Sequence, residues 1–233
     1  PLEDWVARDC RGLNFFDIDR GLQDGLHQYL DGQSLHAIWP HLQALGEVAG
    51  GELDHLSDLA DKHPPVLHHR DRFGRDEQWI EMHPAYREME RIAYQRFGIH
   101  RAAHAEGQFG RDRPWSPLVK YALQYLFVQG EFGVMCPVSM TDSGWSLIEA
   151  FASDELREKL RPHVLADNLD DLWRCAHLMT EKGAGSDVGN LETRAVPQPD
   201  GTWRIHGDKW FCSNADAEVI LLLARPEGAA AGT

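Results

Sequence analysis

The stretch MTEKGAGSDVGN, residues 179–190, packs three glycines, a serine and two acidic residues into a dozen positions. Glycine frees the backbone so that successive N–H groups can surround an anion, but the same composition also forms simple surface turns. A dinucleotide-binding loop needs a helix after it, whereas LETRAV, residues 191–196, alternates like a strand. A Walker loop is also excluded, because no Gly-Lys-Ser/Thr ends the stretch. On the residues alone, a phosphate-binding loop and an inert turn stay equally open.

A second cluster, DKWFCSN at residues 208–214, places two aromatic residues beside a small hydroxyl. Trp210 or Phe211 could stack on a planar cofactor while Ser213 donates to a ring nitrogen. The alternative is that both aromatic side chains belong to the core of a sheet. Taken alone, this cluster favours the alternative.

The apolar spacing is helical up to about Leu165. We expect Gly50 and Gly51 to break one helix and Gly98 to cap another at its C-terminus. The segment 117–135 is apolar around nearly its whole circumference, which predicts a helix at the centre of the core. The helices are expected at residues 22–30, 35–45, 53–59, 84–97, 117–135, 143–152 and 154–160.

Strand patterns follow the helical region. They cover residues 191–196, 202–206 and 218–224, the last of which is expected to be buried. Helices first and strands second predict an α+β fold, with an N-terminal all-helical domain at 1–168 and a partial antiparallel β-domain at 169–233. Because an odd number of strands ends in PEGAAAGT, we expect this sequence to be the front part of a longer polypeptide.

The composition limits the partners of the chain. Of its 233 residues, 23 are Lys or Arg and 37 are Asp or Glu, which gives a net charge of −14 and argues against nucleic-acid binding. The candidate basic patch is HHRDRFGR, residues 68–75, which we interpret as a solvated loop. Four scattered cysteines indicate free thiols in a reducing compartment. Without a signal pattern or an apolar run of about 20 residues, the sequence predicts a cytoplasmic protein that does not enter a membrane.

His100 and His104 are a candidate metal pair, because they are spaced i, i+4. A metal site at this spacing needs a third ligand nearby, and HRAAHAEGQ, residues 100–108, offers only Glu106. We therefore interpret the pair as a solvated helix face and predict no metal site.

The glycine stretch and the aromatic cluster together resemble two segments of the acyl-CoA dehydrogenase family. Its members carry a T-E-P-x-A-G-S-D loop, a strand pair and a K-x-W-I-T-N segment, and this chain has TEKGAGSD at 180–187 and KWFCSN at 209–214. The resemblance implies an N-terminal helical domain, a middle β-domain and a C-terminal helical bundle, with FAD lodged between the last two. The bundle is absent up to Thr233.

The resemblance also implies contacts with the flavin. Thr180 would hydrogen-bond the pyrimidine side of the ring, and Ser186 would face the phosphate or the pantetheine of an acyl-CoA substrate. Phe211 falls where the family has a tryptophan stacked on the ring, and Ser213 where a threonine donates towards flavin N5. The expected cofactor contacts are His177, Met179, Thr180, Gly185, Ser186, Phe211 and Ser213.

Four features of the chain are similar to the alkylation-response (AidB-like) branch of the family. Lys182 replaces the usual proline, and the chain carries HPPVLHHRDRFGR at 63–75, MHPAY at 82–86 and CPVSMT at 136–141. In that branch, DNA association is attributed to a basic C-terminal region, which this sequence does not contain.

The family reaction needs a carboxylate that removes the proton α to a thioester carbonyl while a β-hydride goes to flavin N5. That base is a glutamate of the C-terminal bundle, so we expect it beyond Thr233 and assign no catalytic residue here. We interpret Glu181 as a structural carboxylate that accepts backbone N–H bonds.

We therefore predict that this chain is the N-terminal portion of an FAD-dependent acyl-CoA dehydrogenase-like oxidoreductase. We expect the chain to be inactive on its own. By family analogy the protein is a homo-oligomer, a tetramer, with an unassigned electron acceptor. The alternative is an alkylation-response or DNA-repair accessory flavoprotein, or a flavin-free interaction module.

Overall fold

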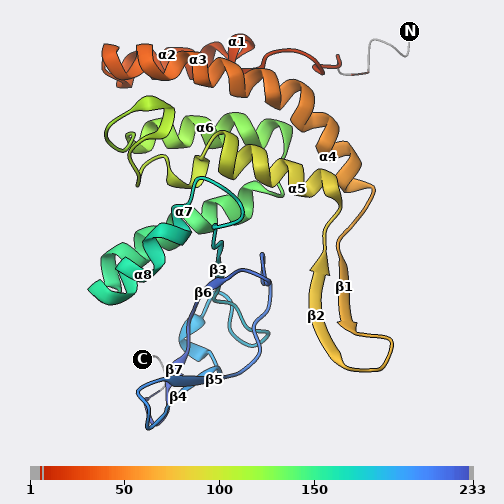
Figure 1. The fold of residues 1–233 in the computed structure, drawn as a ribbon, viewed down its shortest axis with the longest axis vertical. Coiled ribbons are helices and arrows are strands. Elements are labelled where there is room, and N and C mark those ends of the chain that lie inside the picture. The colour runs from red at the N-terminus through yellow and green to blue at the C-terminus, as the bar shows by residue number, and fades with distance from the viewer. Residues whose placement is uncertain (1–5, 7, 231–233) are drawn as a thin grey trace.

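The chain folds into a helical part followed by a smaller β part (Figure 1). This computed structural model describes residue 6 and residues 8–230. The α-helices are α1 (Phe15–Ile18), α2 (Arg20–Tyr29), α3 (Gly32–Val48), α4 (Asp54–Asp61), α5 (Pro84–Glu90), α6 (Pro117–Gly130), α7 (Met135–Phe151) and α8 (Asp154–Val164). The strands are β1 (Val66–Arg70), β2 (Asp76–Glu81), β3 (Cys175–Leu178), β4 (Arg194–Pro197), β5 (Trp203–His206), β6 (Val219–Leu222) and β7 (Arg225–Pro226). The predicted α+β order is confirmed.

Several helices begin at a capping residue or at a proline. The side chains of Asn14, Asp31 and Ser153 accept hydrogen bonds from the first free N–H groups of α1, α3 and α8. Pro84 and Pro117 occupy the first position of α5 and α6, where a missing N–H costs nothing. The helix starts are therefore set by local sequence.

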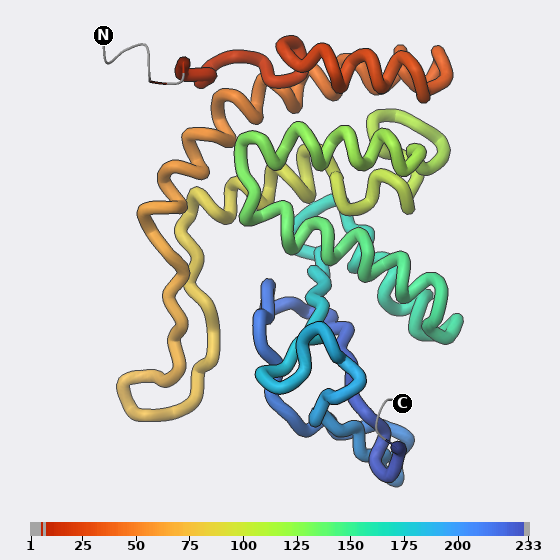
Figure 2. Tube along the Cα trace, turned by 180° about the vertical axis from the view of Figure 1, so that it is seen from behind, coloured from red at the N-terminus to blue at the C-terminus, as the bar shows by residue number. Residues whose placement is uncertain are grey.

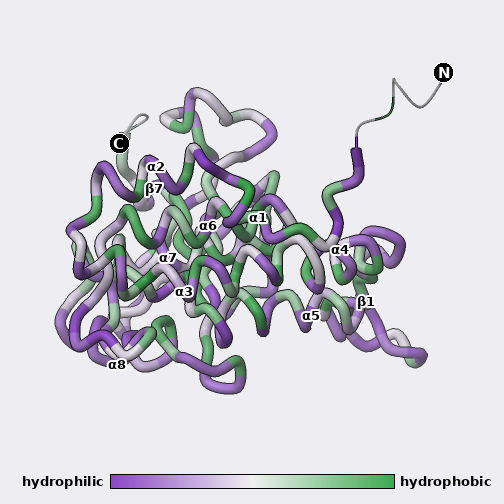
Figure 3. Tube along the Cα trace, turned by 90° about the horizontal axis from the view of Figure 1, so that it is seen from above, coloured by the Kyte–Doolittle hydropathy of each residue, from purple (hydrophilic) through white to green (hydrophobic). Residues whose placement is uncertain are grey.

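The helical core lies where α3, α6 and α7 pack together. Leu42 and Leu45 of α3, and Leu123 and Phe127 of α6, are fully buried there. Hydrophobic and hydrophilic residues alternate along the helices in Figure 3, as expected for amphipathic helices around one core.

The expected helix break at Gly50 and Gly51 is wrong, because the chain continues from α3 into α4 through a π-helical turn at Ala49–Leu53. Gly50 lies so close to the preceding segment that an added Cβ would lie 1.9 Å from the Leu13 carbonyl oxygen. This glycine therefore permits close packing of the backbone instead of ending the helix. Gly98 is left-handed (φ 52°), as predicted for a helix C-terminus.

Two expectations about α6 and α7 need correction. The central position of α6 is confirmed, but Tyr121 and Tyr125 are exposed, so its apolar circumference is not wholly buried. The segment 117–135 ends as a helix at Gly130, and α7 begins at Met135 instead of Ser143. Pro137 is tolerated in α7 because the N–H groups of a first helical turn have no partner within the helix.

HHRDRFGR is part of a β-hairpin: residues 68–70 belong to β1, so the predicted solvated loop is confirmed only for the turn at 71–75. β1 and β2 pair antiparallel, with Val66 opposite Glu81. At the tip, Gly74 is left-handed (φ 82°), and the Asp71 carboxylate accepts hydrogen bonds from the backbone N–H groups of Phe73 and Arg75. The hairpin extends away from the helices in Figures 1 and 2.

The interpretation of His100 and His104 as a solvated helix face is also wrong. His100 is fully buried and bonds to the Ala166 carbonyl oxygen, and burial lowers its pKa to about 3. His104 Nε2 lies 2.7 Å from Asp142, whose other carboxylate oxygen lies 2.8 Å from Lys120 Nζ. The histidines thus serve packing and a buried ionic network.

The β part mixes parallel and antiparallel pairs, which corrects the expected antiparallel domain. Among the described strands that follow α8, β4 and β5 pair antiparallel, whereas β3 pairs parallel with β6 and β4 with β7. Parallel pairs arise because the long crossovers 179–218 and 198–224 bring later strands back in the same direction. The prediction that the strand at 218–224 is buried is wrong, because β6 is half-exposed. Among the described strands β6 pairs with β3 alone, so its other edge has no neighbouring strand.

The two parts are joined where β3 packs on α7. An added Cβ on Gly144 would lie 2.7 Å from Cys175 Cβ, so the two elements approach closely. The Cys175 N–H donates to the Thr141 hydroxyl at 3.1 Å. Arg174 then contacts both parts: it lies 3.2 Å from Glu90, the buried last residue of α5, and 3.1 Å from Glu218.

We predict that Gly144→Ala lowers the free energy of unfolding by about 1–3 kcal/mol, because the new methyl group overpacks the joint. Gly25→Ala is the matched control, since nothing lies within 4 Å of its Cβ position and alanine favours a helix. Urea denaturation of both variants checks this. Equal stability of Gly144→Ala and Gly25→Ala would show that the joint is loosely packed.

Candidate functional site

The glycine stretch and the aromatic cluster lie side by side at the end of β3. The Trp210 N–H donates to the Thr180 carbonyl oxygen at 2.8 Å, and Lys209 Nζ donates to the Met179 carbonyl oxygen at 3.2 Å. Lys182 Nζ lies 5.1 Å from the centre of the Trp210 ring. The adjacency that both motifs required is therefore confirmed.

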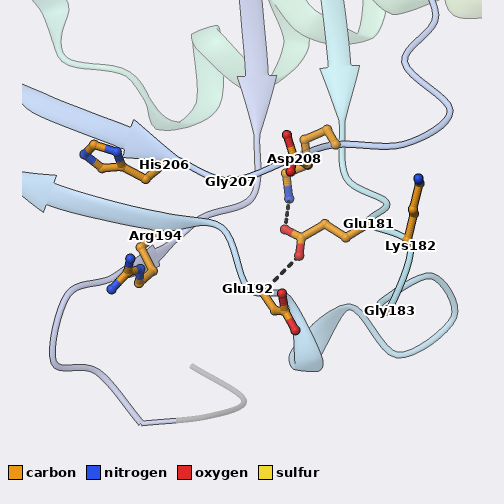
Figure 4. Close-up of a pocket in the computed structure, with 9 residues that line it drawn as sticks. Glu181, Lys182, Gly183, Glu192, Arg194, His206, Gly207 and Asp208 are labelled. Atoms are coloured by element: carbon orange, nitrogen blue, oxygen red, sulfur yellow. Dashed lines mark hydrogen bonds and ion pairs between the residues drawn. The ribbon is translucent and has the colours of Figure 1, made fainter.

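The buried Glu181 carboxylate holds together this junction between the glycine stretch and the aromatic cluster (Figure 4). Its carboxylate accepts hydrogen bonds from the backbone N–H of Glu192 at 2.6 Å and of Thr193 at 3.1 Å. The Thr193 hydroxyl also donates to it at 2.5 Å, and Lys209 Nζ lies 2.7 Å away. The interpretation of Glu181 as a structural carboxylate is confirmed.

The charge state of Glu181 follows from these contacts. Burial alone would raise its pKa, but the bonds from Lys209, Thr193 and the two backbone N–H groups lower the pKa to about 2. Glu181 is therefore ionised in the folded state and fully engaged, which makes it unsuitable as a general base.

The predicted contact residues differ in exposure. His177, Met179 and Thr180 are half-buried where β3 runs into the loop, whereas Gly185, Ser186, Phe211 and Ser213 are exposed. All of them belong to the two adjoining segments, so the structure brings the set to one region of the β part.

Phe211 has an unusual conformation. Its backbone is left-handed (φ 56°), which is uncommon for a bulky residue, and its side chain is 81% exposed. The ring meets Trp210 edge-on at 5.5 Å between centroids. The expectation that both aromatic rings belong to a sheet core is thus excluded.

His177 connects the loop to the helical part. Burial lowers its pKa, and an added Cβ on Gly144 of α7 would lie only 3.5 Å from its Nε2 atom. Its Nε2 atom is buried without a partner among the described residues. A buried nitrogen without a partner can bond to a bound molecule.

An apolar groove of about 520 Å³ lies between α6 and α7. Ser143 lines this groove, and the Cβ position of the next residue, Gly144, lies 3.5 Å from His177 Nε2, so the groove adjoins the start of the glycine loop. Its lining includes Tyr121, Tyr125, Val128, Phe132, Met135 and Met140. Such a lining suits an aliphatic chain.

A second cavity, of about 400 Å³, lies between the glycine loop and the β4–β5 pair (Figure 4). Charged side chains of both signs line it, among them Lys182, Glu192, Arg194 and Asp208. None of Thr180, Ser186, Phe211 or Ser213 lines this cavity, so it is distinct from the region predicted for the flavin.

The motifs did not identify three residues that hold the junction. Lys209 pairs with Glu181, Asn214 donates its amide to the Cys175 carbonyl oxygen, and Arg225 donates to the carbonyl oxygens of Leu191 and Gly189. Lys209 and Asn214 belong to the KWFCSN segment, so the sequence motif already placed both residues near the glycine stretch. Arg225 begins the two-residue strand β7 and carries no sequence signal.

Within residue 6 and residues 8–230, no group of three or more His, Cys, Asp or Glu side chains could hold a metal ion. In that same part of the chain, no helix combines the length and apolar character needed to cross a membrane.

The fold and this junction define a chain of the acyl-CoA dehydrogenase type, and comparison with known proteins agrees. The family described as the adaptive response protein AidB N-terminal domain matches residues 6–171, and the acyl-CoA dehydrogenase middle domain matches residues 176–233. The chain therefore belongs to the acyl-CoA dehydrogenase family, in its AidB-like branch, and the predicted resemblance is confirmed.

Individual relatives support this assignment. The chain is 30% identical to putative acyl-CoA dehydrogenase AidB of Escherichia coli (strain K12), over 80% of this chain and 35% of the relative. It is 28% identical to acyl-CoA dehydrogenase family member 11 of Caenorhabditis elegans, over 91% of this chain and 34% of the relative. The chain thus spans about a third of the length of these relatives.

Solved structures show the same fold. Bd2924 in its apo-form matches with a TM-score of 0.85 and 29% identity, over 97% of this chain and 45% of that one. Caenorhabditis elegans ACDH-11 in complex with C11-CoA matches with a TM-score of 0.81 and 24% identity, over 98% of this chain and 38% of that one.

We predict that Glu181→Gln lowers the free energy of unfolding by about 3 kcal/mol, because it leaves Lys209 buried beside an uncharged amide. Since the folded-state pKa of Glu181 lies below its ordinary value of 4.5, the carboxylate stabilises the fold fully above pH 4.5. This stabilisation by the carboxylate disappears as the pH falls towards 2. The Glu181→Gln variant should lack it at every pH.

Urea denaturation at several pH values measures this difference. Glu155→Gln, an exposed change on α8, is the control. If Glu181→Gln and Glu155→Gln unfold alike at neutral pH, the carboxylate does not hold the junction.

Proposed function

We propose that this chain forms the flavin-holding part of an FAD-dependent, acyl-CoA dehydrogenase-like oxidoreductase. The observation that carries the proposal is the contact between the glycine stretch and the aromatic cluster at Trp210 and Thr180. Membership in the family supports the same reaction class. The division into a helical domain at 1–168 and a β-domain at 169–233 is part of this proposal.

The residues present fit a flavin. The exposed, left-handed Phe211 offers a ring face, and the unpartnered Nε2 of His177 offers a buried polar contact. Thr180 and Ser213 would hold the polar edge of the ring, and Gly185 with Ser186 the phosphate side. When bound, FAD supplies the hydride acceptor of the reaction.

The groove between α6 and α7 would hold the acyl chain of the substrate. It is apolar and adjoins His177, so an acyl chain lying in it would place the thioester near the flavin contacts. ACDH-11, which shares the fold, was solved with C11-CoA. Ser186, exposed on the loop, is the proposed contact for the rest of the acyl-CoA.

Proton abstraction is not assigned to this chain. Glu181 is held ionised by Lys209 and by backbone N–H groups, so its lone pairs are already used. We therefore assign binding and orientation to the residues described and no catalytic base.

A second candidate function is an accessory role in the response to alkylation damage. The match to the adaptive response protein AidB N-terminal domain favours it. Electrostatic DNA binding must weaken steeply with salt, so a salt titration of DNA affinity tests this role. The net charge of −14 argues against such binding by this chain itself. Self-association, a tetramer by family analogy, and a cytoplasmic location stay predictions.

We predict that the full product of the gene encoding this chain is yellow when purified. The absorbance spectrum should show bound flavin, and denaturation should release FAD identifiable by chromatography. A colourless product that also fails to take up added FAD contradicts the proposal and leaves the accessory role.

Ser213→Val should weaken FAD binding about tenfold, because it removes one hydrogen-bond donor of about 1.4 kcal/mol. Ser57→Val, in α4, is the control. Quenching of FAD fluorescence in a titration measures both affinities. Equal affinities for the two variants would remove Ser213 from the site while leaving the cofactor proposal intact.

A further inference from the structure

Buried polar atoms without a partner gather in one stretch of the helical part. Eight such side-chain atoms occur in the described part of the chain. Four of them lie within residues 100–111, namely His100 Nδ1, Arg101 Nε, Gln108 Oε1 and Arg111 Nε. Burying a polar atom without a hydrogen bond costs free energy, so this concentration calls for a structural or functional reason. The stretch is therefore a candidate site for a bound molecule.

Arg101 and Gln108 line the same cavity, which has a volume of about 210 Å³ and lies between residues 94–101 and residues 107–109. The two side chains are close neighbours. An added Cβ on Gly98 would lie 3.3 Å from Gln108 Nε2 and 3.4 Å from Arg101 Cγ. The lining thus brings an unused acceptor, Gln108 Oε1, close to an unused donor, Arg101 Nε.

The surrounding loop holds the Gln108 amide in one orientation. Gln108 Nε2 donates to the Phe97 carbonyl oxygen at 2.5 Å, and turning the amide over would set two oxygens against each other. Oε1 is therefore the atom left for a ligand. Gly107, Phe109 and Gly110 are all left-handed, with φ of 87°, 54° and 74°. A strained conformation such as that of Phe109 is typical of ligand sites, where the surrounding contacts enforce it.

The rest of the lining limits the kind of ligand. Three of its residues are aromatic, namely Tyr94, Phe97 and Phe109. Aromatic side chains suit the faces of a flat ring. The volume is below the range of about 300–1,000 Å³ that is typical for drug-sized ligands, so the ligand is small.

The charges of the cavity are already paired. Arg96 lies 3.0 Å from Glu52, and both are salt-bridge partners. Arg101 lies 3.4 Å from Asp167. Because neither arginine offers an unpaired charge, and a buried charge without a partner is costly, the cavity favours a neutral molecule.

We infer that this cavity binds a small, neutral, planar amide, whose N–H donates to Gln108 Oε1 and whose carbonyl oxygen accepts from Arg101 Nε. A carboxamide on an aromatic ring and a lactam such as uracil both present these two groups side by side. None of the residues proposed for the flavin or for the α6–α7 groove lines the cavity. Binding at this cavity is therefore independent of FAD and acyl-CoA.

Matched ring compounds test whether an amide is recognised. The full product of the gene encoding this chain is titrated with benzamide, uracil and acetophenone, and binding is measured by saturation-transfer NMR of each compound. We expect benzamide and uracil to bind. Acetophenone keeps the ring and the carbonyl but has no N–H, so it should bind at least about tenfold more weakly than benzamide. Equal binding of acetophenone and benzamide would overturn the inference.

Two substitutions test the two contacts separately. Gln108→Leu removes the acceptor, and Arg101→Lys removes the Nε donor while keeping a positive charge near Asp167. Each should weaken benzamide binding about tenfold. Gln129→Leu is the control, because Gln129 also donates Nε2 to a backbone carbonyl but is exposed on α6.

Circular dichroism verifies that each variant is folded. If Gln108→Leu unfolds, Arg101→Lys decides the result, because it leaves the bond between Gln108 and Phe97 intact. A folded variant of either kind that binds benzamide like the wild type overturns the inference. So does a wild-type protein that binds neither benzamide nor uracil, since ordered water alone then occupies the cavity.

Discussion

The arrangement of the two parts depends on Arg174, which lies between buried Glu90 of the helical part and Glu218 of the β part. Because Arg174 directly precedes Cys175, the same few residues make the ionic contact and the close packing of β3 on α7. A buried charge pair tolerates little displacement, since separating its members leaves charges without partners in a poorly solvated region. The glycine stretch starts at Met179, five residues after Arg174, so this anchor fixes its position relative to the groove.

Backbone contacts hold the site in place more than the side chains of the predicted cofactor-contact residues do. Glu181 and Lys209 hold the two segments together from within, and this leaves Phe211 and Ser213 facing outward. This difference in role explains why some residues of one short motif are buried while others are exposed. Those that fix the loop are inside, and those available to a ligand are outside.

Sequence patterns predicted the helices, the order of the two parts and the pairing of the two motifs, because each depends on local spacing or on a specific combination of residues. They failed where the outcome depends on distant neighbours. Gly50 looked like a helix break, yet it is required by the Leu13 carbonyl that lies against it. The pair His100 and His104 looked solvated, because nothing local reveals the Ala166 carbonyl and the Asp142 carboxylate that receive them. β3 was missed since four residues are too few for a recognisable alternation.

The buried thiol of Cys175 has a practical consequence. Burial raises its pKa to about 12, so the unreactive thiol form persists at neutral pH, whereas Cys10 and Cys136 are exposed. With Cys10, Cys136 and the half-buried Cys212 replaced, alkylation would report on Cys175 alone, and it would be slow because it requires β3 to separate from α7. The rate of this alkylation would therefore measure how often β3 separates from α7.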